Sequence, residues 1–597
     1  MHIITPLLIP AVLVAAARVP YREYILAPSS RVIVPASVRQ VNGSVTNAAG
    51  LTGSSLGTAV FHGVSSVTYD FGKNVAGIVS LTVGSSSSPS AFLGVTFSES
   101  SLWASSEACD ATGNSGLDAP LWFPVGQKAG TYTPDSKYVR GGFRYLTVVS
   151  NTSATIPLNS LHITFTAAPD QDLQAYQGWF HSNDELLNEI WYAGAYTNQL
   201  CTIDPTYGSA SSETISTSGL NYWYNNLTIA NGTSTVTDGA KRDRAVWPGD
   251  MSISLESIAV STNDLYSVRM GLEALLALQS SEGQLPWGGK PFNIDVSYTY
   301  HLHSLIGMSF LYRFSGDKVW LSNYWGQYSK GVEWAVRSVA DGVKSAANQL
   351  LWDDQAGLYR DNQTTELHPQ DGNAWAVKSN LTLSGSQNRA ISQALKARWG
   401  RYGAPAPEAG ATISPFIGGF EIQSHFLANQ PDVALDMIRL QWGFMLRDPR
   451  MTQSTLIEGY STDGSIHYAP YANDARISHA HGWSTGPTYA LTAYAAGLQL
   501  LGPAGNSWLI APQPGGLTSI DCGFATALGV FSVVFERDSV GRYNSFSFGA
   551  PTGTTGRIEL PGVRGTLVST TGQRVQLVNG TASGLRGGKW KLIESAD

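Results

Sequence analysis

One stretch of this sequence is unusually dense in charge, and the interpretation of the fold starts from it: Asp238-Gly239-Ala240-Lys241-Arg242-Asp243-Arg244-Ala245-Val246-Trp247-Pro248-Gly249-Asp250. Only 14% of the 597 residues are charged, so a run of this length should hold about two charges, yet it holds three acidic and three basic residues. Pro248 and Gly249 disfavour a continuous helix, so we expect a loop, with Asp250 capping a helix that begins near Met251.

Carboxylates packed among cations acquire pKa values that differ from one another. An acid beside an arginine stays ionised, whereas an acid against an aromatic wall or a second acid can keep its proton near neutrality. This pattern suits acid–base catalysis. It fits equally well a buried ion-pair cluster that only fixes a loop, and these residues alone do not separate the two interpretations.

A second candidate group follows Thr455-Leu456-Ile457-Glu458-Gly459. Glu458 comes after two apolar residues, and His467, His479 and His481 lie close behind it. The His-x-His pair could suggest a metal, but no carboxylate and histidine set at a recognised zinc spacing accompanies it. We therefore predict no metal site and no cofactor.

Asp243 and Glu458 are 215 residues apart and belong to different helix–loop units. In a ring of such units the loops converge on one face, and two facing carboxylates are the minimal equipment for glycoside hydrolysis. Trp247, Trp287 and Trp483 could stack on a sugar ring, although most of the 17 tryptophans should lie in the core. Nucleotide-binding glycine loops, the Gly-x-Ser-x-Gly elbow and His-Glu-x-x-His are missing from the sequence.

Outward from these loops, residues 171–504 read as alternating helix and loop with no regular strand. Ser182 and Glu185 form a capping box, and apolar residues then recur at helical spacing. The remaining helical runs are 253–278, 300–314, 319–339, 388–401, 418–426, 433–446 and 485–501. The pattern favours a helical toroid or bundle.

The flanking regions read as short strands separated by Gly, Ser and Asn. In residues 18–170 the runs are 31–34, 66–71, 78–83 and 145–149, with a turn or bulge expected at Gly141-Gly142. In residues 505–597 they are 530–536, 545–548, 557–560, 566–569 and 574–578. We predict two β-sandwiches, one on each side of the helical region.

Residues 1–17 resemble a secretory signal, since an apolar segment ends at Val14-Ala15-Ala16-Ala17. No later apolar run is long enough for a membrane span. Seven Asn-x-Ser/Thr sequons, at Asn42, Asn151, Asn226, Asn231, Asn362, Asn380 and Asn579, support export. A net charge of −7 argues against nucleic acid as a partner, and three dispersed cysteines allow at most one disulfide. We expect a secreted, glycosylated protein and leave its oligomeric state open.

The 238–250 stretch resembles the acidic signature of glycoside hydrolase family 78, the α-L-rhamnosidases, in their secreted fungal form. Further similar segments are Asp70-Phe71-Gly72-Lys73-Asn74-Val75-Ala76-Gly77, Gly142-Phe143-Arg144-Tyr145, Ser182-Asn183-Asp184-Glu185-Leu186-Leu187-Asn188 and Leu456-Ile457-Glu458 with Asp463-Gly464-Ser465. The resemblance covers nearly the whole chain after residue 17. It implies a multidomain α+β protein with a central (α/α)6 barrel flanked by N-terminal and C-terminal antiparallel β-sandwich domains.

By position, the resemblance implies that Asp243 is the general acid and Glu458 the general base of an inverting hydrolase, with about 6.5–9.5 Å between the carboxyl groups. It implies that the rhamnose ring is bound by Asp238, Arg242, Trp247, Asp250, Trp287 and His481. The signature is one residue shorter here, Gly239-Ala240 replaces Cys-Pro, and Asp stands where Glu is usual. Asp238 and Asp250 therefore remain alternatives for the acid.

We accordingly expect an enzyme that hydrolyses terminal α-L-rhamnosyl linkages of glycosides or plant polysaccharides. One alternative is a polysaccharide lyase with the same barrel, in which Lys241, Arg242 and Arg244 would neutralise a uronate. The other is a carbohydrate-binding relative that has lost catalysis. A new double bond in the product would identify the lyase, and sugar binding without turnover would identify the inactive relative.

Overall fold

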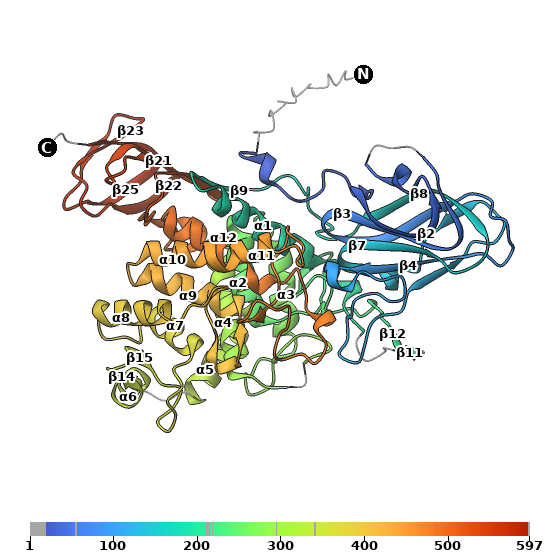
Figure 1. Ribbon diagram of the computed structural model, residues 1–597. Helices are drawn as coiled ribbons and strands as arrows, with labels where there is room; N and C mark the ends of the chain where they lie inside the picture. Colours follow the sequence, from blue (N-terminus) through green and yellow to red (C-terminus); the bar gives the residue numbers. More distant parts are fainter. Residues whose placement is uncertain are drawn as a thin grey trace, which may run out of the picture.

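The computed structural model describes residues 19–594 apart from 54–56, 211–214, 218, 294 and 339–341. The predicted signal at residues 1–17 lies outside the described residues. Figure 1 shows a β-rich region at each end of the molecule and a helical region between them. Among the described helices, none combines the length and the apolarity that crossing a lipid bilayer requires.

The N-terminal sheet has eight strands in the order β1-β8-β3-β7-β4-β5, and β2 and β6 both pair with β3. Their bounds are β1 Val32–Ile33, β2 Ser37–Thr46, β3 Ala59–Val83, β4 Phe92–Ser98, β5 Leu121–Pro124, β6 Gly130–Tyr132, β7 Arg140–Ser150 and β8 Thr155–Phe165. Two of the predicted runs belong to one long strand, β3. The pairing of β3 with β7 is irregular opposite Gly141-Gly142, as the predicted bulge requires.

The helical region contains helices at nearly all the predicted positions. Their bounds are α1 Glu185–Cys201, α2 Pro248–Val260, α3 Leu265–Leu276, α4 Tyr298–Ser315, α5 Lys318–Ser338, α6 Val343–Leu350, α7 Gln370–Lys378, α8 Gly385–Lys396, α9 Pro415–Leu427, α10 Pro431–Met437, α11 Gly443–Arg447 and α12 Gly486–Ala490. A π-helical turn over Ile438–Trp442 joins α10 to α11. Helix α12, the last α-helix of this region, packs against α1, the first. The two ends of the helical region therefore meet.

Several local predictions were wrong. The helix predicted over 485–501 continues from α12 only through a π-helical turn at Leu491–Ala495, and Leu498–Leu500 form a strand. Helix α2 begins at Pro248 with Trp247 as its N-cap, which places Asp250 inside the first turn; proline suits the first helical position because the N–H it lacks would have no partner there. The side chain of Asp184, rather than Ser182, caps α1 by accepting from the Leu187 amide. The described part of this region also forms four two-stranded sheets, although no regular strand was predicted here, because each strand is only two or three residues long. The pairs are β10 Thr202–Ile203 with β13 Thr235–Val236, β11 Ile215–Thr217 with β12 Leu220–Tyr222, β14 Trp352–Asp353 with β15 Leu358–Tyr359, and β16 Thr412–Ile413 with β17 Tyr460–Ser461.

The C-terminal sheet has nine strands in the order β24-β23-β25-β22-β21-β20-β9, with β19 pairing with β22 and β18. Their bounds are β9 Gly178–Ser182, β18 Leu498–Leu500, β19 Ser507–Ile510, β20 Ser519–Thr526, β21 Gly529–Arg537, β22 Tyr543–Glu559, β23 Gly565–Ser569, β24 Arg574–Gln576 and β25 Thr581–Glu594. The β19–β22 pair is parallel, so this sheet is not purely antiparallel as expected. Strand β9 comes from the chain before α1, and the sheet therefore draws on both sides of the helical region (Figure 1).

The hydrophobic cores show how the regions are joined. One cluster of buried side chains runs continuously from the helical region into the C-terminal sheet. The N-terminal sheet has a separate cluster that includes Phe61, Tyr69, Phe97 and Phe143. Among the described residues of this sheet, only Ala76 and Phe165 belong to the first cluster, so the apolar contact between the sheet and the helical region is small.

Candidate active site

Two loops that are far apart in the sequence form the candidate site. Gly239 and His481 make an isolated β-bridge. The Ala240 amide donates to the Ala480 carbonyl at 3.0 Å, and the Gly482 amide donates to the Asp238 carbonyl at 2.7 Å. Backbone hydrogen bonds thus fix the charge-dense loop against the loop that follows Glu458.

Glu458 is a buried carboxylate held by several donors. Its Oε1 accepts from Arg242 Nη2 at 2.7 Å and from the Tyr471 hydroxyl, and its Oε2 accepts from the Ser478 amide at 3.0 Å. Burial alone would raise the pKa of Glu458, but the charges of Arg242 and His481 and the hydrogen bonds from Tyr471 and Ser478 lower it to about 2. Glu458 is therefore ionised at any physiological pH.

Asp243 is the most accessible carboxylate of the site, with 17% of its side chain exposed. Its Oδ1 pairs with Arg242 Nη1 at 3.1 Å and with Arg476 Nη2 at 2.8 Å. Its Oδ2 accepts no hydrogen bond from the described residues and is free to meet a ligand. Two guanidinium groups therefore meet at Oδ1.

Arg242 connects the two predicted catalytic carboxylates, because its Nη1 contacts Asp243 and its Nη2 contacts Glu458. Oxygens held by the two terminal nitrogens of one guanidinium can be no more than about 8 Å apart. The separation is therefore compatible with the about 6.5–9.5 Å of an inverting glycosidase.

Asp238 lies beneath Asp243 and is 3% exposed. Its Oδ2 accepts from the Asp243 amide at 2.9 Å and its Oδ1 from the Ala245 amide at 3.2 Å. Burial, followed by the charge of Asp243, raises the pKa of Asp238 to about 7. Asp238 is thus the acid in this loop that can hold a proton near neutrality.

His481 links Asp250 to Glu458. Its Nε2 lies 3.0 Å from Asp250 Oδ1, and its Nδ1 lies 4.0 Å from Glu458 Oε2. Burial alone would lower the pKa of His481, but the two carboxylates raise it. Burial raises the pKa of Asp250 despite the histidine.

Aromatic rings gather beside the charged cluster. The rings of Trp247 and Trp287 meet edge to face with 4.9 Å between centroids, and Phe292 stacks on Trp247 at 5.1 Å. On the other loop, Trp483 lies 4.4 Å from the His481 ring and donates its indole N–H to the Glu458 carbonyl at 2.8 Å. Trp287 and Trp483 are only partly buried, so each can present ring surface to a sugar.

The structure brings together all eight residues proposed from the sequence. Asp238, Arg242, Asp243, Asp250, Glu458 and His481 form the charged cluster, and Trp247 and Trp287 form the adjoining aromatic pair. Two further members were missed, Tyr471 and Arg476, which lie in a loop with no recognisable motif. Of the three cations considered for a uronate, only Arg242 faces Glu458, since Arg244 bonds to backbone carbonyls and Lys241 points to the N-terminal sheet.

His479 and His481 have different surroundings, and the described residues contain no group of three or more His, Cys, Asp or Glu side chains arranged to hold a metal ion. His467 pairs with Asp474 at 2.7 Å, away from both.

Comparison with solved structures gives consistent matches to one kind of enzyme. The α-L-rhamnosidase from Dictyoglumus thermophilum aligns over 95% of this chain and 64% of its own, with a TM-score of 0.67 and 15% identity. The family GH78 rhamnosidase of Bacillus sp. GL1 aligns over 80% of this chain and 52% of its own, with a TM-score of 0.61 and 17% identity. The rhamnosidase from Klebsiella oxytoca with rhamnose bound aligns over 79% of this chain and 97% of its own, with a TM-score of 0.58 and 18% identity. The chain has the fold of the α-L-rhamnosidases.

The resemblance noted in the sequence is therefore confirmed for the fold. At these identities the likeness concerns the fold alone, and the chain spans about half to two thirds of the length of the first two structures. No family model and no curated protein matches the sequence significantly.

Proposed function

We propose that this protein is a glycoside hydrolase that removes terminal α-L-rhamnosyl residues from glycosides or plant polysaccharides. One observation carries the proposal: a single guanidinium, that of Arg242, holds both Asp243 and Glu458, so the two held oxygens are close enough together for both carboxylates to act on one glycosidic bond. The rhamnosidase fold and the rhamnose bound to the Klebsiella oxytoca enzyme support the choice of sugar.

In the proposed mechanism Glu458 is the general base. Its low pKa keeps it ionised, and its carboxylate would accept a proton from the water that attacks the anomeric carbon from the face opposite the leaving group. One displacement inverts the anomeric configuration.

Asp243 is the proposed general acid, acting through its free Oδ2. The bond from the anomeric carbon to the leaving oxygen breaks as that oxygen takes the proton. Asp238, with a pKa of about 7, is the alternative proton donor.

The experiment compares Asp243→Asn, Asp238→Asn and Glu458→Gln on aryl and alkyl α-L-rhamnosides, with the product anomer followed by nuclear magnetic resonance. Loss of the acid should leave the hydrolysis of nitrophenyl substrates nearly unchanged, because their leaving group needs no proton. It should lower the rate of hydrolysis of alkyl substrates by about 10²–10⁴-fold. Loss of the base should reduce both. Nearly full activity of Glu458→Gln and of both Asp variants on alkyl rhamnosides refutes the assignment.

A second candidate is a lyase, and one observation favours it. The Tyr471 ring lies between the guanidinium groups of Arg242 and Arg476, at 4.8 and 4.6 Å from its centroid. Such a group could neutralise a uronate carboxylate, after which proton loss at C5 and departure of the C4 substituent leave a C4–C5 double bond. Burial and Glu458 raise the pKa of Tyr471, so its phenol suits a proton donor rather than a base. A product absorbing in the ultraviolet would establish this chemistry, and sugar binding without turnover would indicate the inactive relative.

We further propose that the helices form an (α/α)6 barrel within residues 171–504, flanked by sandwich domains over 18–170 and 505–597, with β9 contributing to the last. The packing of α12 on α1 supports a closed ring. We also propose that the protein is secreted and glycosylated, since the asparagine of each of the seven sequons is exposed.

A further inference from the structure

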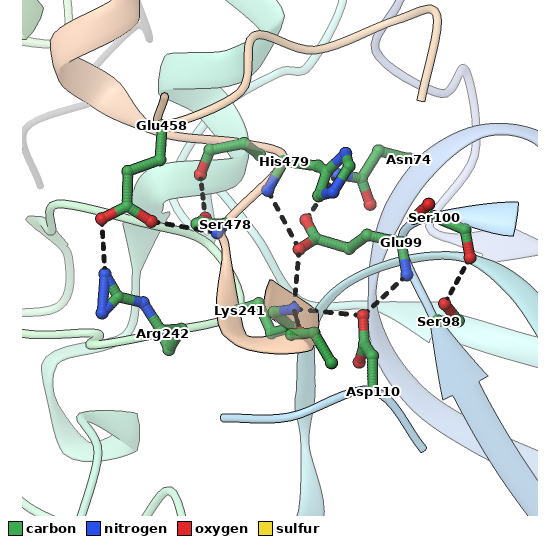
Figure 2. A network of polar contacts seen from close by, with 12 residues as sticks. Asn74, Ser98, Glu99, Ser100, Asp110, Lys241, Arg242, Glu458, Ser478 and His479 are labelled. Atoms are coloured by element: carbon green, nitrogen blue, oxygen red, sulfur yellow. Dashed lines mark hydrogen bonds and ion pairs between the residues drawn. The ribbon is translucent and has the colours of Figure 1, made fainter. Parts of the chain in front are cut away.

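The N-terminal sheet meets the site loops through buried charges. Glu99 directly follows β4, Asp110 lies in the loop beyond it, and Arg140 begins β7; all three are at most 1% exposed. Lys241, from the charge-dense loop, reaches into this group and is also 1% exposed. Figure 2 shows Glu99 and Asp110 on one side, Arg242 and Glu458 on the other, and Lys241 and His479 between them.

Lys241 is fully occupied by this contact. Its Nζ lies 3.1 Å from Asp110 Oδ2 and 3.3 Å from Glu99 Oε2, and it donates to the Ala475 carbonyl at 3.0 Å. Arg140 pairs with the other oxygen of Asp110, which leaves Lys241 as the link between the sheet and the loop. Since Lys241 precedes Arg242, this contact fixes the backbone from which Arg242 extends.

Glu99 contacts both site loops with one carboxylate. Its Oε2 pairs with Lys241 and accepts from the His479 amide at 3.1 Å. The neighbouring Ser478 amide donates to Glu458. Two of the three groups that donate to Glu458, the guanidinium of Arg242 and the amide of Ser478, are thus each one residue from a contact with Glu99.

The sheet and the loop are also in direct contact. A Cβ on Gly141 would overlap the Ala240 carbonyl, and a Cβ on Gly142 would lie 2.6 Å from Glu99 Oε1. Because no gap separates β7 from residues 240–241, a movement of the sheet edge is transmitted to the loop.

We infer that Glu99 and Lys241 are positioning residues: their buried pair sets the spacing of two of the donors that hold Glu458, Arg242 and the Ser478 amide, so that the N-terminal sheet is part of the active-site structure. The kinetic consequence rests on the proposed function, whereas the structural consequence does not. A buried ion pair contributes little net stability because its desolvation is costly, but its geometry is specific. A misplacement of 1 Å at a reacting group can cost about 10²-fold in rate.

The test uses the full-length protein with Glu99→Gln, which keeps the size of the side chain and removes its charge. The matched control is Arg144→Met. Arg144 joins Asp70 of the sheet to the Thr452 carbonyl and to Gln453, so it bridges the same two regions away from Arg242 and Ser478.

We expect Glu99→Gln to lower kcat at least about tenfold with KM within about twofold, and Arg144→Met to leave both within about twofold. Hydrogen exchange should become faster in residues 238–245 and 476–482 of Glu99→Gln alone. If Glu99→Gln does not fold, Glu99→Asp keeps the charge but shortens the reach, and it should show the same changes to a smaller degree.

Unchanged exchange in these segments, or equal effects of the Glu99 and Arg144 variants, overturns the inference. The exchange measurement needs no substrate. A wild-type protein that hydrolyses no rhamnoside would therefore refute the proposed function. Hydrogen exchange in the Glu99 variant would still show whether Glu99 positions the site loops.

Discussion

At the scale of single residues, the environment of each carboxyl group decides its protonation. Glu458 and Asp238 lie in the same buried cluster, yet the pKa is about 2 for the first and about 7 for the second. The difference arises because Glu458 faces Arg242 and several donors, whereas Asp238 is buried against the charge of Asp243. Carboxyl groups of the two site loops therefore differ in pKa.

Residue identities could be predicted further than residue roles. Asp238, Arg242 and Glu458 were found from charge density and from a carboxylate after apolar residues. Tyr471 and Arg476 were not, because a tyrosine and an arginine in a loop carry no signal until the fold places them beside Glu458 and Asp243. The two cations at Asp243, which bear directly on its role as an acid, are likewise a property of the folded chain.

Tyr471→Phe should move the acidic limb of the pH–rate profile to higher pH. The hydroxyl donates to Glu458 and lowers its pKa, so its loss raises that pKa. Activity that requires ionised Glu458 is lost as pH falls through its pKa, and the loss will begin at higher pH in the variant. The measurement is kcat/KM from acidic to neutral pH.

The control for this variant is Tyr460→Phe, whose buried hydroxyl instead donates to the Tyr402 carbonyl at 2.6 Å. It should lower stability without moving the acidic limb. An unshifted limb in Tyr471→Phe, or equal shifts in both variants, contradicts the role of the phenol. The free energy of unfolding should depend on pH in the same direction as the activity. The stabilisation that comes from ionised Glu458 is present above the ordinary pKa of a glutamate and disappears as pH falls towards 2.

At the scale of elements, periodic patterns predicted helices well because a buried face repeats every three to four residues. Helices α4, α5 and α9 lie within a few residues of their predicted bounds. The membership of β9 in the C-terminal sheet could not be predicted, since strand pairing depends on contacts more than 300 residues apart. The start of α2 was missed because Pro248 was taken as a helix breaker, although proline is favourable at a first helical position.

Gly141 in β7 is the element-scale position most sensitive to substitution. Gly141→Ala would place a methyl group against the Ala240 carbonyl and the Arg244 side chain, displacing the site loop. We expect a fall in kcat of at least about 10²-fold together with a lower Tm, since both loop and sheet must shift. The measurements are steady-state kinetics and thermal unfolding.

Gly130→Ala provides the comparison, because Gly130 starts β6 of the same sheet and the nearest atom to its added methyl group would be 3.8 Å away. It should change neither kcat nor Tm appreciably. Normal activity of Gly141→Ala would show that the loop tolerates displacement.

At the scale of the whole molecule, the regions are joined in two different ways. The C-terminal sheet shares an apolar core with the helices, whereas the N-terminal sheet keeps its own core and meets the site loops through Glu99, Asp110 and Lys241. Composition predicted three regions but not this difference, because it depends on which residues meet. Covalent links contribute nothing, since Cys109, Cys201 and Cys522 are buried and unpaired.

The distribution of asparagines over the whole surface gives the last prediction. All seven sequon asparagines are exposed, whereas Asn74, Asn188, Asn198, Asn221, Asn225 and Asn373 are buried and lie outside sequons. Glycans can therefore attach without displacing packed side chains, and none of the seven positions belongs to the candidate site. The protein secreted by a eukaryotic host should migrate above its 63.8 kDa polypeptide mass and lose the excess on treatment with peptide-N-glycosidase. Peptide mass spectrometry should then find aspartate at the occupied sequons, with kcat and Tm unchanged. Secretion without any glycan would contradict the proposed glycosylation. A protein that stays inside the cell with its first 17 residues attached would contradict the proposed export.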